Sequence, residues 1–107
     1  MSHPNLWPDF QYRINDPAYY ENTTQQMLKI IRALLSLNQT GVFTAFFEYF
    51  AHTGTLDIRL YKGRWNHTKS PEARYSIDCR NEALIDCQTE ETITADTLIE
   101  KMMLVVQ

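Results

Sequence analysis

The residue types that most often act as nucleophiles, bases or metal ligands are few in this sequence and lie far apart. They are His3, His52, His67, Cys79 and Cys87. The separation of the two cysteines matches neither a Cys-x-x-Cys redox motif nor a zinc knuckle. Gly-x-Ser-x-Gly, His-Glu-x-x-His and glycine-rich phosphate-binding motifs are also missing. We therefore expect a protein that is not an enzyme and that uses no cofactor and no metal. The alternative is an enzyme in which a cysteine nucleophile is paired with a histidine base, and the candidate pairs are Cys79–His52 and Cys87–His67.

The composition is that of one ordinary globular domain. The chain has 107 residues, of which 44% are hydrophobic and 21% charged, with a formal net charge of −3. This length suits a single domain spanning residues 1–107. The mild charge does not point to nucleic acid as the main partner. The sequence has no 18-residue apolar run and no basic segment followed by an apolar one, so we expect no membrane association and a cytoplasmic location with reduced cysteines.

Apolar residues recur at helical spacing in two segments, which predicts helices over 22–37 and 94–106. Asn22 is the expected cap of the first helix and Thr94 that of the second, and Asn38 and Gly41 follow the expected end of the first. The predicted buried stripes comprise Met27, Ile30, Ile31, Leu34 and Leu35 in the first helix, and Leu98, Ile99, Met102, Val105 and Val106 in the second.

The segment between the helices predicts an antiparallel sheet over 42–79. Its first run also fits a helical face, but its aromatic and β-branched content and the Thr53-Gly54 turn pair favour strands. Alternation over Ala73–Cys79 predicts a third strand, and Ala83–Ile85 fits either a short strand or a helical turn. The expected fold is α+β, in the order helix, three-stranded antiparallel sheet, helix, with both helices in a single layer on one sheet face. Residues 1–21 form an aromatic arm with a short strand at Phe10–Ile14, which covers the core or reaches a partner.

A two-residue turn would set the register of the predicted hairpin. Residue i then faces residue 107 − i, which places Glu48 opposite Arg59 as an ion pair across the strands. The expected core face carries Phe43, Ala45, Phe47, Tyr49, Leu56, Ile58 and Leu60. The other face carries Phe46, Glu48, Phe50, Asp57, Arg59 and Tyr61. Because exposed aromatic residues mixed with charges are typical of contact surfaces, this second face is a candidate interface. Three alternatives could cover this second face of the hairpin: the N-terminal arm, a second copy of the chain or a foreign protein.

The loop after the second strand is the other candidate surface. Basic residues and an aromatic one alternate in Lys62–Lys69, and Arg64, Trp65 and Lys69 would hold phosphates and stack a base. The alternative is a solvated loop with Trp65 in the core. Most charged residues further along the chain are acidic, a polarity that suits a basic partner or a second copy.

Two resemblances accompany this interpretation. The order of elements resembles that of double-stranded RNA-binding domains, but Thr94-Ala95-Asp96-Thr97 departs from the basic start of their last helix. The hairpin, with Phe47-Glu48-Tyr49 and Leu56–Tyr61 followed by Trp65, resembles small uncharacterised phage and prophage proteins. That resemblance implies an accessory protein of a mobile element and implies no activity.

We therefore expect a small non-enzymatic protein-interaction module, an accessory protein or inhibitor, that binds an unknown protein or forms a homodimer. The expected contact residues are Phe46, Glu48, Phe50, Arg59, Tyr61, Arg64, Trp65 and Lys69. The alternative function is nucleic-acid binding through the Lys62–Lys69 loop.

Overall fold

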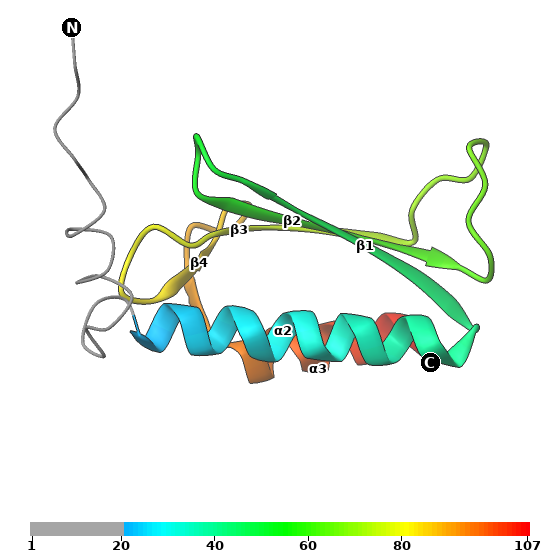
Figure 1. Cartoon of the computed structure of the whole chain (residues 1–107), viewed down its shortest axis with the longest axis horizontal. Helices are drawn as coiled ribbons and strands as arrows, with labels where there is room; N and C mark the ends of the chain where they lie inside the picture. Colours follow the sequence, from blue (N-terminus) through cyan, green and yellow to red (C-terminus); the bar gives the residue numbers. More distant parts are fainter. Residues whose placement is uncertain (1–20) are drawn as a thin grey trace, which may run out of the picture.

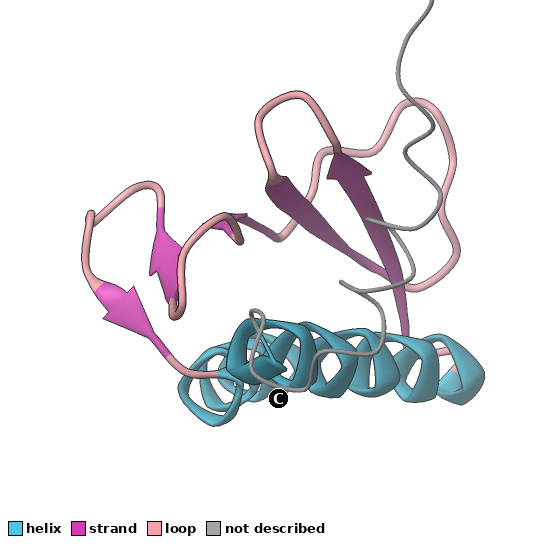
Figure 2. Cartoon of the chain, turned by 60° about the vertical axis from the view of Figure 1, so that its left-hand side comes forward, coloured by secondary structure: helices cyan, strands magenta, loops and turns pink. Residues whose placement is uncertain are grey.

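Over residues 21–107, the protein is an α+β structure with two helices and one five-stranded antiparallel sheet (Figure 1). The computed structural model describes residues 21–107, so the predicted strand at Phe10–Ile14 and the arm before Glu21 lie outside the described residues. The elements are α2 (Glu21–Thr40), β1 (Phe43–Phe50), β2 (Thr55–Lys62), β3 (Ala73–Asp78), β4 (Leu84–Asp86), β5 (Thr92–Ile93) and α3 (Ala95–Val106). Both helices lie on the same side of the sheet, next to each other (Figure 2).

The sheet is a meander in which each strand pairs with the next, in the order β1-β2-β3-β4-β5. The prediction of three strands was therefore wrong by two. The segment left open at Ala83–Ile85 lies largely in β4, which pairs with β3 and with the two-residue β5. The sequence did not predict β4 and β5 as strands because segments of three and two residues are too short to show an alternating pattern. Each still buries one apolar side chain, Leu84 in β4 and Ile93 in β5.

Helix α2 is longer than predicted at both ends. Asn22 does not cap it: the helix begins at Glu21, and the Asn22 side-chain amide donates a hydrogen bond to the Glu82 carbonyl at 3.0 Å. Asn38 lies inside the helix, which ends at Thr40. Gly41 follows with a φ of 72°, the left-handed conformation in which glycine ends helices at low cost.

The predicted helical stripes are partly confirmed. In α2, Ile30 and Leu34 are buried as expected, whereas Leu35 is half-exposed and its predicted burial was wrong. In α3, Thr94 caps the helix by accepting a hydrogen bond from the Thr97 N–H at 3.2 Å. Helix α3 packs chiefly against α2 and less against the sheet than the predicted layer required. The core contains Ile30, Leu34, Leu37, Phe43, Ala45, Leu56, Ile58, Leu60, Ile77, Leu84, Ile93, Ala95, Leu98 and Met102.

The hairpin register differs from the prediction by two residues. Residue i of β1 pairs with residue 105 − i of β2, because the turn has four residues and the Gly54 N–H donates to the Phe50 carbonyl at 2.8 Å. Glu48 therefore faces Asp57, and Arg59 faces Phe46.

The predicted faces of the hairpin survive this shift, because moving a register by two residues leaves every side chain on its original face. Most of the predicted core face is buried or packed against the core. Tyr49 is the exception: it is 54% exposed, and its predicted burial was wrong.

Candidate interaction surface on the hairpin

Three aromatic side chains meet on the sheet face that points away from the helices. Phe46 comes from β1, Tyr61 from β2 and Trp65 from the loop after β2. The ring centroids lie 5.5 Å apart for Phe46–Tyr61, 5.4 Å for Phe46–Trp65 and 6.5 Å for Tyr61–Trp65, all edge to face. Each such contact adds about 0.5–1.5 kcal/mol beyond the burial of its area. We call Phe46, Tyr61 and Trp65 the aromatic cluster.

A glycine at the end of β2 brings the tryptophan back over the sheet. Gly63 has a φ of 67°, and its N–H donates to the Val42 carbonyl at 2.7 Å. The Gly63 carbonyl accepts a hydrogen bond from the Thr44 hydroxyl, also at 2.7 Å. Both backbone groups of Gly63 are thus held by the start of β1, and the chain that follows carries Trp65 to Phe46. The sequence pattern did not identify this role of Gly63.

The cluster is layered from the sheet outward. Tyr61 is only 5% exposed although it lies on the outer face, whereas Trp65 is 47% exposed. Trp65 is therefore not in the core, where the solvated-loop alternative from the sequence would have placed it. Within residues 21–107, Phe46 and Tyr61 cover part of the Trp65 indole, and about half of Trp65 remains exposed.

Two charged side chains border the cluster. The Arg59 guanidinium carbon lies 5.6 Å from the centre of the Phe46 ring, a distance typical of cation–π contacts. The Arg59 Nη2 also lies 3.9 Å from Glu48 Oε1, so this predicted pair is formed diagonally rather than directly across the strands. Glu48 directly faces Asp57, and Arg74 lies 3.9 Å from that second carboxylate.

The remaining predicted contact residues lie outside the cluster. Phe50 is near the turn, where its ring meets His52 at a centroid distance of 6.4 Å. Arg64 is exposed in the loop. The Lys69 ammonium donates a hydrogen bond to the Lys62 carbonyl at 2.6 Å, which folds the loop onto itself. The structure thus gathers Phe46, Glu48, Arg59, Tyr61 and Trp65, and leaves Phe50, Arg64 and Lys69 apart.

The two cysteines lie in different environments. Burial raises the pKa of the Cys79 thiol to about 11, and its Sγ lies 3.4 Å from the Ile77 carbonyl oxygen as a hydrogen-bond donor. A thiol with such a pKa is protonated near neutral pH, whereas nucleophilic cysteines act as thiolates. Cys87 is exposed and free. In the described part of the chain, no three histidine, cysteine or acidic side chains are grouped so that they could hold a metal ion.

In its described residues, the chain is a small α+β fold in which a five-stranded meander carries two helices on one side and the aromatic cluster on the other. Comparisons with protein-family models, with curated proteins and with solved structures find no match for this chain. Between Glu21 and Gln107, no helix is long and apolar enough to span a membrane.

Proposed function

We propose that the protein is a non-enzymatic interaction module whose contact surface is the aromatic cluster with Arg59 and Glu48. The half-exposed indole of Trp65, held in place by Phe46 and Tyr61, is the observation that supports this proposal most. Tryptophan, tyrosine and arginine are the residues that most often contribute large binding energies at protein interfaces.

The packing of the cluster favours binding for an entropic reason. Each ring is already in contact with two others, so a partner would not have to order them on binding. Arg59 and Glu48 add a polar rim to an apolar centre, the usual arrangement of protein interfaces. In line with the hairpin resemblance, we propose the role of a cytoplasmic accessory protein or inhibitor of a phage or mobile element, with a foreign protein or a second copy as the partner.

The experiment compares Trp65→Ala with Leu104→Ala, because Leu104 is 72% exposed on α3 and is not part of the cluster. Size-exclusion chromatography with light scattering on the wild type first tests the homodimer. If the wild type is monomeric, affinity capture with both variants tests a foreign partner. We expect Trp65→Ala to lose the dimer or the captured protein and Leu104→Ala to keep it. Equal behaviour of the two variants would contradict the proposal.

Nucleic-acid binding through the Lys62–Lys69 loop is the second candidate. The exposed Arg64 next to the half-exposed Trp65 supports it, because a cation beside an aromatic ring suits a phosphate next to a base. Binding of a labelled single-stranded oligonucleotide should then weaken as salt increases, and both Arg64→Ala and Trp65→Ala should reduce it. Absence of binding at low salt would eliminate this candidate.

A further inference from the structure

Strand β1 is the last strand at one side of the sheet, and among residues 21–107 its outer edge has no neighbouring strand. In an antiparallel ladder, alternate residues direct both backbone groups towards the partner strand, and the residues between them direct theirs away. Val42 accepts a hydrogen bond from Gly63, which assigns the even-numbered residues of β1 to β2. Phe43, Ala45, Phe47 and Tyr49 therefore direct their N–H and C=O groups to the outer edge.

Asn38 shows that this assignment is correct and closes part of the edge. Its side-chain oxygen accepts from the Ala45 N–H at 2.6 Å, and its amide donates to the Ala45 carbonyl at 3.0 Å. The Asn38 amide thus makes the same pair of hydrogen bonds that a neighbouring strand would make. Edge strands are commonly protected from pairing in such ways.

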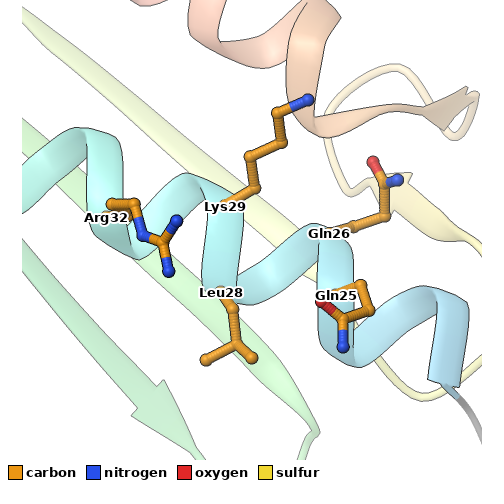
Figure 3. A pocket seen from close by; sticks show the side chains of 5 residues that line it. All are labelled: Gln25, Gln26, Leu28, Lys29 and Arg32. Carbon is orange, nitrogen blue, oxygen red and sulfur yellow. The ribbon is translucent and has the colours of Figure 1, made fainter.

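Phe47 and Tyr49 have no equivalent partner in the described part of the chain. The side of α2 that carries Asn38 also carries three apolar residues. Leu28, Ile31 and Leu35 precede Asn38 at helical spacing, so all four lie on the same side of α2. Leu28 and Leu35 are half-exposed. Figure 3 shows Leu28 projecting from α2 towards the side of the hairpin, whereas Lys29 projects towards α3.

The charge at this edge distinguishes between possible occupants. Glu48 lies between the two open residues, and its side chain is 59% exposed. It faces Asp57 across the sheet, and its own ion-pair partner Arg59 lies diagonally from it at 3.9 Å. A second copy of β1 that exchanged hydrogen bonds between Phe47 and Tyr49 would place Glu48 directly against its own copy, and like charges in that position are destabilising. A basic residue at the same position would be favourable.

We propose that the edge of β1 over Phe47–Tyr49 binds an extended segment of a partner protein, with the pattern apolar–basic–apolar, as an added strand. The two apolar residues exchange backbone hydrogen bonds with Phe47 and Tyr49 and place their side chains on the side of α2, over Leu28 and Leu35. The basic residue lies opposite Glu48 on the other face. This edge shares Glu48 with the contact surface proposed above but contains no residue of the aromatic cluster, so a Trp65 variant distinguishes the two sites.

The test is an NMR titration of the full chain with two peptides, acetyl-Thr-Ile-Lys-Ile-Thr-amide and its counterpart with glutamate in place of lysine. We expect the backbone amides of Phe47 and Tyr49 to shift and to exchange more slowly with the lysine peptide. The lysine peptide should bind at least fivefold more tightly at low salt, and Glu48→Lys should reverse this preference. Trp65→Ala should leave both affinities unchanged, which separates this site from the aromatic cluster.

Three results would overturn the proposal. The first is equal binding of the two peptides, or no binding of either. The second is slow exchange of the Phe47 and Tyr49 amides without peptide that grows with protein concentration, which would identify a second copy as the occupant. The third is slow exchange that is independent of concentration and lost in Arg13→Glu, which would assign the edge to Tyr12-Arg13-Ile14, a segment of this chain with the same pattern.

Discussion

Gly54, in the turn of the hairpin, is constrained both by its backbone conformation and by its neighbours. Its φ is 66°, and a Cβ atom at this position would lie 2.0 Å from Cγ of Arg80. Its carbonyl also accepts a hydrogen bond from the Cys79 N–H at 2.8 Å, which joins the turn to the end of β3. Backbone conformation and close approach therefore both require glycine here.

We predict that Gly54→Ala destabilises the protein more than Gly41→Ala. Gly41 has a similar φ of 72° but nothing within 4 Å of its would-be Cβ, so only the left-handed strain of about 1–2 kcal/mol applies there. Gly54→Ala should cost about 1–3 kcal/mol more, because the Arg80 side chain must move. Urea unfolding of both variants measures the difference, and equal losses would show that Arg80 yields freely.

A second prediction concerns the two thiols. Because burial raises the pKa of Cys79 to about 11, this thiol is almost fully protonated at pH 8 in the folded protein. Alkylation at pH 8 followed by peptide mass spectrometry should modify the exposed Cys87 first, and Cys79 should react at a similar rate only after denaturation. Rapid modification of Cys79 in the folded state would argue against this protonation state.

At the scale of elements, short polar links hold the helices to the sheet and to each other. Asn38 joins α2 to β1 at Ala45. The Gln26 side-chain oxygen accepts a hydrogen bond at 2.6 Å from the N–H of Ala95, the first residue of α3. These links fix where each helix lies along its neighbour, which apolar contacts alone do not specify.

We predict that Asn38→Ala lowers the free energy of unfolding by about 1–3 kcal/mol, because both backbone groups of the buried Ala45 lose their partner. Gln39→Ala is the control, since its side chain is exposed one position further along the same helix. Asn38→Ala should also self-associate more than the wild type, because a longer part of the β1 edge is open in this variant. Denaturant titration and light scattering test the two effects. Equal stability of the two variants would refute the assigned role of Asn38.

At the scale of the whole molecule, the described elements share one core. Residues from α2, all five strands and α3, including Ile30, Ile58, Ile77 and Leu98, belong to the same buried cluster or pack against it. Because the described elements share this cluster, we expect the helices to be stable only together with the sheet.

We therefore predict a single cooperative unfolding transition. Far-UV circular dichroism, which follows the helices and strands, and near-UV circular dichroism, which follows the packing of aromatic rings such as those of the aromatic cluster, should give the same midpoint in urea. Separate midpoints would mean that the outer face of the hairpin unfolds independently of the core.

Much of the fold follows from patterns between neighbouring residues. Helical spacing located both helices, and Thr94 was identified as a cap. Aromatic and β-branched content with the turn pair located β1, and alternation located β2 and β3. The division of the hairpin into two faces was also correct for most residues, because side-chain direction in a strand alternates whatever the register. The aromatic residues of the outer face were therefore recognisable from the sequence alone.

Only the tertiary structure decided how residues far apart in the chain meet. The four-residue turn placed Glu48 opposite Asp57 and diagonal to Arg59. The bonds made by Gly63 placed Trp65 on the outer face, and Asn38 bound the edge of β1 instead of ending a helix. The physical reason is that periodicity sets the direction of a side chain within its own element, whereas loop geometry and hydrogen bonds between elements determine what that side chain touches.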